Sequence, residues 1–266
     1  MVLRGVILDI RAVAGDFEMM PDAHFVLVDI SNTFTKIAFS SSTKLGKVVK
    51  TPTASLSETV IEGLLGDKRP RHAVVASVVP SKSALMDKVL PGPVCHVNHT
   101  VDLGIGIDYP KPATIGADRL ANAVACVEFY GKPSIVVDFG TAVTFDVISA
   151  EGDYVGGVIA PGLNAMSDYL HSRTALLPLL KLAQPQRAVG RSTTEAMLAG
   201  AVHGYRGLVG EILRQIRREA FPKKKPAVIA TGGDAALIGE GLPLFDSIDP
   251  LLTLKGLRLI GCRNFR

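Results

Sequence analysis

The chain has 266 residues, of which 47% are hydrophobic and 20% are charged, and its formal net charge at pH 7 is +4. This composition excludes an intrinsically disordered chain and is typical of a globular protein with one large domain or two moderate ones. The one dense basic run, residues 223–225, is flanked by prolines and has no interleaved aromatic residue, so we predict a solvated loop there and no nucleic-acid partner.

The cysteines and the apolar runs indicate a cytoplasmic protein without a membrane partner. Cys95, Cys126 and Cys262 lie far apart and show no metal-ligand spacing, which favours a reduced compartment. The apolar run at the N-terminus is broken by Arg4 and Asp9, so it does not resemble a secretion signal. Nothing in the chain approaches the roughly 18 uninterrupted apolar residues that a membrane-spanning helix needs.

The first half of the chain opens with residues 1–24, which match nothing later and form either an extra strand or a stretch upstream of a true start at Met19 or Met20. Residues 25–39 predict a β-hairpin, because an apolar run ends at Asp29 and an alternating run follows a small polar turn. The remaining elements predicted for this half are a strand near 45–50, a helix over 55–65 with Ser57 as a candidate cap, a buried strand at 73–79 stopped by Pro80, a helix near 82–90 and a strand near 93–97.

The second half repeats this plan after a loop rich in glycine and proline, residues 104–112, and a predicted helix over 118–130. A second hairpin is predicted over 135–148, and its first strand ends at Asp138. The further predicted elements are a strand over 154–159, a helix over 162–170, one or two long helices within 193–221, a buried strand at 227–231, a helix over 235–240 and a last strand near 245–249.

The two hairpins indicate an internal duplication, because setting Asp29 over Asp138 also aligns Thr35 with Thr144. Backbone N–H groups and hydroxyls at such tips suit phosphate oxygens, and carboxylates suit cations. The arrangement resembles the phosphate-binding core of the actin, sugar-kinase and Hsp70 ATPase superfamily. We therefore predict an α/β fold of two related ribonuclease-H-like (actin/hexokinase-type) domains, residues 25–131 and 132–266, with mixed sheets, flanking helices and an active site in the interdomain cleft. Residues 1–24 are an N-terminal extension of uncertain status.

Three motifs in order resemble those of the type III pantothenate kinases. Residues 29–36 are similar to the D-x-G-N-T-x-x-K motif, residues 112–119 contain the G-A-D-R segment, and residues 138–146 are similar to D-x-G-T-A-x-T-x-D. A supporting GGxIxPG run contains Gly156, Gly157, Pro161 and Gly162, and the likeness covers roughly residues 25–260.

The resemblance implies ATP-dependent phosphorylation of pantothenate to 4'-phosphopantothenate, the first step of coenzyme A biosynthesis. It also implies a homodimer, Mg2+ bound with ATP, and a monovalent cation, K+ or NH4+. Two alternatives stay open. One is another small-metabolite kinase of the same superfamily, and the other is a nucleotide-binding regulatory module that has lost catalysis.

The resemblance assigns the hairpin tips to ATP and its cations. Asp29 is expected to hold Mg2+ through water, since Mg2+ keeps part of its hydration shell, and Lys36 to add a positive charge beside the phosphates. Asp138 is similar to the family's monovalent-cation ligand; for both aspartates the alternative is a structural role in the turn. The expected ATP-binding residues are Asp29, Ile30, Ser31, Asn32, Thr33, Phe34, Thr35, Lys36 and Thr141, and the turn at 230–233 resembles an adenosine-facing segment.

Asp118 is the expected catalytic residue, a proton acceptor by resemblance. Its position at the start of a helix predicts a lowered basicity, so that orienting the substrate hydroxyl matters more than removing its proton. Arg119 is expected to pair with the pantothenate carboxylate. The other expected substrate-binding residues are Tyr109, Gly116, Ala117 and Thr193, although loop packing for Tyr109 and helix capping for Thr193 are alternatives.

The chain departs from the family's first motif at Ser31, where the family has glycine. If that position requires a positive φ, serine costs about 1–2 kcal/mol. Phe34 is expected to pack beneath the tip, and Asp146 is given no role beyond local hydrogen bonding. An apolar helical stripe of Leu198, Val202, Leu208 and Val209 fits a dimer interface and a core equally well.

Overall fold

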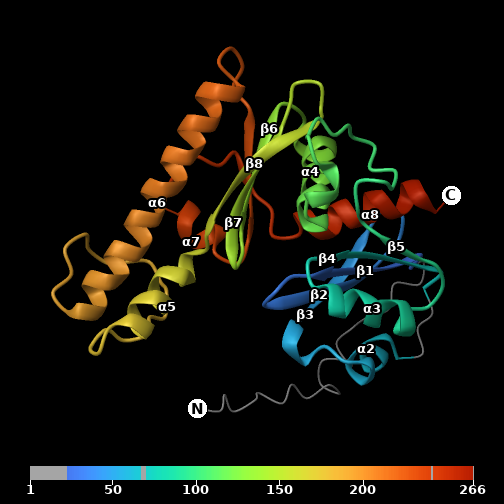
Figure 1. Ribbon diagram of the computed structural model, residues 1–266, viewed down its shortest axis with the longest axis horizontal. Helices are drawn as coiled ribbons and strands as arrows, with labels where there is room; N and C mark the ends of the chain where they lie inside the picture. The colour runs from blue at the N-terminus through green and yellow to red at the C-terminus, as the bar shows by residue number, and fades with distance from the viewer. Residues whose placement is uncertain (1–22, 67–69, 241, 266) are drawn as a thin grey trace. The chain divides into compact units, whose positions relative to one another are not determined.

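The computed structural model describes residues 23–66, 70–240 and 242–265. By their internal contacts these residues divide into two compact units, whose elements are labelled in Figure 1. The first unit takes the described residues up to 104, residues 111–124 and those from 253 onward, and the second takes residues 105–110 and 125–252. Residues 1–22 lie outside the described part, so both explanations for the N-terminal segment stay open.

The first unit is built on a five-stranded mixed sheet in the order β3-β2-β1-β4-β5 (Figure 1). Strands β1 and β2 form the predicted hairpin, β3 pairs antiparallel with β2, and β4 and β5 continue the other side in parallel. The strands are β1 (Phe25–Ile30), β2 (Phe34–Ser40), β3 (Leu45–Pro52), β4 (His72–Ser77) and β5 (Val94–His96).

The second unit repeats this sheet strand for strand, in the order β8-β7-β6-β9-β10. Again the first three strands in the chain are antiparallel neighbours and the last two are added in parallel. The strands are β6 (Ser134–Phe139), β7 (Ala142–Ile148), β8 (Tyr154–Pro161), β9 (Ala227–Gly232) and β10 (Ser247–Ile248). The prediction of an α/β fold with two related mixed sheets is confirmed, because both sheets have the same order and direction of strands.

One face of the first sheet packs on α2 (Glu58–Leu65) and α3 (Pro80–Val89), through a core that includes Val28, Ile61 and Met86. The predicted cap is confirmed, since the Ser57 hydroxyl accepts a hydrogen bond from the Val60 N–H at 3.3 Å. Strand β4 ends at Ser77 and not at Pro80, and Pro80 instead begins α3, where a missing N–H costs no helical hydrogen bond.

The C-terminal helix α8 (Leu252–Asn264) was not predicted. Its leucines alternate like those of a strand, and Gly256 and Gly261 lower helix propensity. Both glycines are packing positions: a Cβ on Gly261 would lie 2.9 Å from the Val74 side chain, and one on Gly256 would lie 1.9 Å from the Ala121 carbonyl oxygen. Helix α8 therefore contacts both the sheet and α4 (Ala117–Tyr130), which begins in the first unit.

In the second unit, α6 (Thr193–Ala220) is one continuous helix and packs on the sheet together with α5 (Leu163–Arg173) and α7 (Ala235–Gly239). Val202 and Val209 are fully buried in this core, and Leu198 and Leu208 pack against it. The apolar stripe is therefore core and not an interface. Residues 223–225 are exposed, as predicted, and in the described ranges no helix has the length and hydropathy of a membrane span.

Candidate active site

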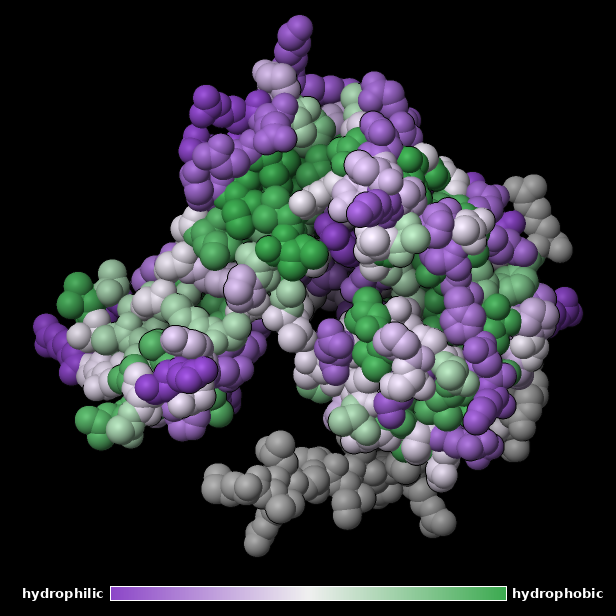
Figure 2. Space-filling model, viewed as in Figure 1, coloured by the Kyte–Doolittle hydropathy of each residue, from purple (hydrophilic) through white to green (hydrophobic). Residues whose placement is uncertain are grey.

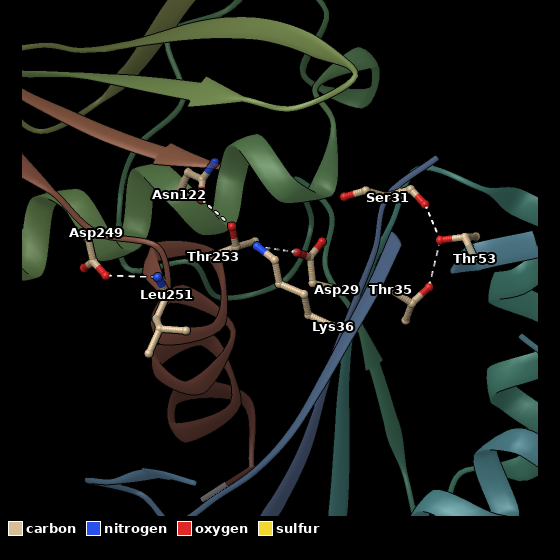
Figure 3. Close-up of polar contacts among 9 residues, drawn as sticks. All are labelled: Asp29, Ser31, Thr35, Lys36, Thr53, Asn122, Asp249, Leu251 and Thr253. Atoms are coloured by element: carbon tan, nitrogen blue, oxygen red, sulfur yellow. Dashed lines mark hydrogen bonds and ion pairs between the residues drawn. The ribbon is translucent and has the colours of Figure 1, made fainter. Parts of the chain in front are cut away.

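The β1–β2 tip places a buried carboxylate opposite a lysine. Asp29 is the register partner of Lys36, and its Oδ2 atom lies 3.8 Å from the Lys36 Nζ (Figure 3). The Asp29 side chain is only 6% exposed, against 25% for Lys36. The apolar run that ends at Asp29 buries the strand and delivers the carboxylate to the tip, where an ammonium group compensates its charge.

A short 3-10 helix, η1 (Thr53–Ser55), braces this tip. The Thr53 N–H donates to the Thr33 carbonyl at 3.0 Å, and the Thr53 hydroxyl donates to the Ser31 carbonyl at 2.7 Å. The same hydroxyl lies 3.0 Å from the Thr35 hydroxyl, and Figure 3 draws Ser31, Thr35 and Thr53. Because Thr35 and Thr53 are fully or almost fully buried, the brace is shielded from competing water.

The structure tests two expectations about the first tip, the conformational penalty at Ser31 and the packing of Phe34. No non-glycine residue of the described ranges has a positive φ, so Ser31 carries no left-handed penalty. Phe34 does not pack beneath the tip: it is 40% exposed, and the Lys50 ammonium of the adjacent strand lies 3.9 Å from its ring centroid. The ring is thus covered by a cation–π contact instead of by the core.

At the β6–β7 tip the residues paired with the aspartate carry hydroxyls, where the first tip has a lysine. The register partners of Asp138 are Thr144 on β7 and Thr231 on β9. Thr231 is 1% exposed, and its hydroxyl has no hydrogen-bond partner among the described residues. A Cβ on Gly232 would lie 2.6 Å from Asp138 Oδ1, so glycine allows the backbone to approach the carboxylate. This set of oxygen atoms fits a hard monovalent cation.

Gly162 braces the second tip as Thr53 braces the first. Its N–H donates to the Thr141 carbonyl at 3.1 Å, and a Cβ there would lie 2.4 Å from that oxygen and 2.5 Å from the Gly140 oxygen. Each bracing residue directly follows a third strand that ends in proline. The sequence analysis did not single out Thr53, and it gave Gly162 only as part of a motif and Thr231 only as part of the 230–233 turn. The shared proline at the end of the third strand was the available signal for the two bracing residues.

The duplication differs in register from the sequence alignment. Asp29 is paired with Lys36, seven positions on, whereas Asp138 is paired with Thr144, six positions on. The first turn is therefore one residue longer, and the structural counterpart of Thr144 is Lys36 and not Thr35. Thr35 instead contacts Thr53.

Asp118 lies in the first turn of α4, and its Oδ1 accepts the Arg119 N–H at 2.9 Å. Burial raises the pKa of the Asp118 carboxyl above its ordinary value, and this outweighs the lowering by the Arg119 N–H and guanidinium. The expected lowered basicity is wrong because desolvation dominates. A Cβ on Gly116 would lie 2.5 Å from Asp118 Oδ1, so glycine makes room for this carboxylate conformation.

Residues 29–36 and 116–119 belong to the first unit, and Tyr109, Asp138, Thr141 and Thr193 belong to the second. The Tyr109 ring lies edge-on to Tyr154, with centroids 6.1 Å apart. Thr193 is exposed as the first residue of α6, and the cap is Ser192, whose hydroxyl accepts the Glu195 N–H at 3.2 Å. Capping is therefore not the role of Thr193.

Asp146 has the local role expected of it. It is fully buried on β7 and accepts a hydrogen bond from the Tyr154 hydroxyl at 3.1 Å. Nearby, burial raises the pKa of the Cys126 thiol to about 11, and the Asp146 and Asp249 carboxylates act in the same sense. At neutral pH this thiol is protonated and packs as a small apolar group.

Comparison with known proteins gives a consistent family. A family model described as type III pantothenate kinase matches residues 25–215. A type III pantothenate kinase of Akkermansia muciniphila is 50% identical over 241 residues, covering 90% of this chain and 99% of that protein. That of Methylacidiphilum infernorum is 46% identical over 236 residues, covering 89% and 87%. Among solved structures, an archaeal actin homologue matches with a TM-score of 0.52 and 13% identity, over 88% of this chain and 98% of the other, which supports an actin-like fold.

Proposed function

The chain belongs to the type III pantothenate kinase family, and we propose that its two hairpin tips and the first turn of α4 carry out the reaction. As a pantothenate kinase it uses ATP to phosphorylate pantothenate, the first step of coenzyme A biosynthesis. The observation that carries the residue assignment is the repeated tip: in each sheet the second-last residue of the central strand is an aspartate, and the residue after the third strand hydrogen-bonds to the turn.

At the first tip we propose that Asn32 and Thr33 donate hydrogen bonds to the phosphate oxygens of ATP, within the ATP-binding stretch 29–36. Both residues are exposed on a turn that η1 holds in place. Asp29 would hold Mg2+ through water, and Lys36, 3.8 Å from the Asp29 carboxylate, would neutralise phosphate charge. A phosphoryl transfer whose charge spreads over the phosphate oxygens needs mainly such positioning and neutralisation.

At the second tip we propose that Thr141 binds phosphate and that Asp138 holds the monovalent cation. The partnerless buried hydroxyl of Thr231 supports this assignment, because a cation would supply the missing interaction of a group that is costly to bury alone. A bound K+ or NH4+ would add positive charge beside the triphosphate.

For the acceptor, we propose that Asp118 orients the pantothenate hydroxyl and accepts its proton. A carboxylate with a raised pKa is a better proton acceptor than an ordinary one, provided that it is ionised at the working pH. Arg119 would pair with the pantothenate carboxylate in a forked arrangement, and Tyr109 and Thr193 would line the remainder of its site with Gly116 and Ala117.

We also propose a homodimer, with a face different from the one the sequence suggested. Exposed large hydrophobic side chains are most frequent in residues 159–189 of the second unit, from the end of β8 through α5 and the chain that follows, where Figure 2 shows hydrophobic residues interspersed with hydrophilic ones. They are Ile159, Met166, Tyr169, Leu176, Leu179 and Val189. An exposed apolar cluster of this kind marks an interaction surface, and a second copy of the chain is the partner that the family implies.

The dimer is tested by light scattering after size exclusion. The double variant Leu176→Asp, Leu179→Asp should be a monomer. Lys224→Asp is the control: it also adds negative charge, but outside this segment, so it should remain a dimer. A dimeric double variant would contradict this face. We propose a cytoplasmic location, where the three cysteines, which form no disulfide in the described chain, stay reduced.

The proposed chemistry is tested by a coupled ADP assay with pantothenate and ATP, with and without K+. Asp118→Asn should lower kcat by about 10²–10⁴-fold. The raised pKa means that Asp118 favours the folded state only while protonated, a contribution lost as pH rises through its folded pKa. At neutral pH the variant should therefore be at least as stable as the wild type. An active variant, or one that unfolds more easily at pH 7, would contradict the assignment.

A further inference from the structure

Helices α4 and α8 touch backbone to backbone one turn away from Asp118. The Gly256 Cα faces the peptide after Ala121: an added Cβ would lie 1.9 Å from the Ala121 oxygen, 2.6 Å from its carbonyl carbon and 3.0 Å from its Cα. No side chain fits between the two helices at this point. The position of the first turns of α4 is therefore set by α8, and any residue larger than glycine at 256 would push α4 away.

A buried hydrogen bond lies beside this contact. The Thr253 hydroxyl of α8 donates to the Asn122 Oδ1 of α4 at 2.9 Å, and the two residues are 3% and 0% exposed (Figure 3). Asn122 is four residues after Asp118, so the two side chains project from the same face of α4, one turn apart. Leu120 of α4 and Leu254 and Leu257 of α8 are fully buried as well.

A hydrogen bond at this place restricts rotation of α4 about its axis more strongly than apolar packing does. Apolar contacts hold two helices at a distance but allow small rotations about the helix axis, whereas a buried hydrogen bond weakens steeply when its geometry changes. A group about 5 Å from a helix axis moves by about 1 Å when the helix rotates by about 10°. A misplacement of about 1 Å at a reacting group can cost about 10²-fold in rate.

We propose that Thr253 and Asn122, with Gly256, are positioning residues that fix the rotation of α4 and so the place of the Asp118 carboxylate. The inference rests on the proposed role of Asp118, and it assigns to the C-terminal helix a part in phosphoryl transfer. We assign no substrate contact to Thr253 or Asn122. They act through Asp118, so their effect belongs to kcat and not to ATP binding.

The alternative is that the pair only joins two helices, and a matched set of variants separates the two roles. Thr253→Val removes the hydroxyl at nearly constant volume, and Thr253→Ser keeps it. Ser40→Ala is the control, because it removes a fully buried hydroxyl in the same unit, bonded to the Ser41 and Lys44 carbonyls at 2.8 and 3.0 Å, at the end of β2 opposite the tip.

The measurement is kcat and both KM values for these variants, each made in the wild-type and the Asp118→Asn background, together with urea unfolding. Thr253→Val should lower kcat about tenfold, with the KM for ATP within about twofold, and Thr253→Ser should restore kcat. In the Asp118→Asn background the same change should alter kcat by less than about twofold, because residues that act through one group are not additive. Ser40→Ala should lose similar stability with kcat unchanged.

A Thr253→Val enzyme with wild-type kcat, or an equal loss of kcat in both backgrounds, would overturn the positioning role. An impaired Thr253→Ser enzyme would overturn the part played by the hydroxyl. These failures are distinct from failure of the proposed function, in which wild-type enzyme shows no pantothenate-dependent ADP release or Asp118→Asn retains full activity.

Discussion

The β1–β2 tip and the β6–β7 tip occupy equivalent places in two sheets of the same strand order, yet they surround their aspartates with different groups. Opposite Asp29 stands Lys36, with 3.8 Å between ammonium and carboxylate. Opposite Asp138 stand the hydroxyl residues Thr144 and Thr231. The braces differ too, since Thr53 uses its side chain and its N–H while Gly162 uses only backbone.

On the proposed assignment, the difference explains how one duplicated hairpin can serve two kinds of cation. A carboxylate within about 4–6 Å of an ammonium is already compensated and stays ionised at low cost. A carboxylate flanked by hydroxyls offers oxygen ligands and gains more from a cation that comes from solution. On the proposed assignment, we therefore expect the first tip to work with the Mg2+ of the nucleotide and the second to bind the proposed monovalent cation.

The largest expected effect comes from removing each carboxylate in turn. Asp29→Asn and Asp138→Asn should each lower kcat/KM by about 10²–10³-fold, since each removes an electrostatic contact to the transferring phosphate or its cation. The two should differ in a K+ titration of the residual activity. Asp29→Asn should keep K+ activation and Asp138→Asn should lose it; the opposite pattern would reverse the assignment of the two tips.

Gly162→Ala should have the next largest effect, on stability. An added methyl group would collide with the Thr141 and Gly140 oxygens at 2.4 and 2.5 Å, so the second tip must shift. We expect a loss of about 2–3 kcal/mol in the free energy of unfolding, measured in urea, with a raised KM for ATP. The control is Gly207→Ala in α6, where nothing lies within 4 Å of the new Cβ and a helix former is favoured. Equal stability of the two variants would show that the tip tolerates the shift.

These braces mark the limit of what sequence patterns predict. The hairpins, both sheets and most helices follow from local periodicity and turn residues, and the site motifs lie within single local segments. The contacts of Thr53 and Gly162 depend on register across three strands, which no local pattern encodes. Helix α8 was missed because its leucines alternate and its glycines have packing roles, and the pKa of Asp118 was misjudged because the helix end was visible in the sequence while its burial was not.

A further variant gives the second tip a lysine in the position that Lys36 has at the first tip. Thr144→Lys places an ammonium opposite Asp138, as Lys36 stands opposite Asp29. The K+ dependence of kcat should fall about tenfold, because a nearby positive charge reduces the demand of the carboxylate for another cation. Thr144→Met, similar in length without the charge, should keep its K+ dependence. If both variants respond alike to K+, the lysine at the first tip does not explain the difference between the tips.

The smallest effects should come from exchanging the turn residues that stand two positions after each aspartate, Ser31 and Gly140. Neither has a positive φ, and a Cβ on Gly140 would make an ordinary contact at 3.4 Å with the Ala142 oxygen. Ser31→Gly should cost at most about 0.5–1 kcal/mol, through the greater freedom of glycine in the unfolded chain, and should leave activity unchanged or raise it. Gly140→Ser should stabilise by a similar or smaller amount. Urea unfolding and kcat/KM for ATP measure both. A large loss of activity in Ser31→Gly alone would mean that the serine hydroxyl has acquired a contact to the nucleotide, and that the two turns are no longer interchangeable.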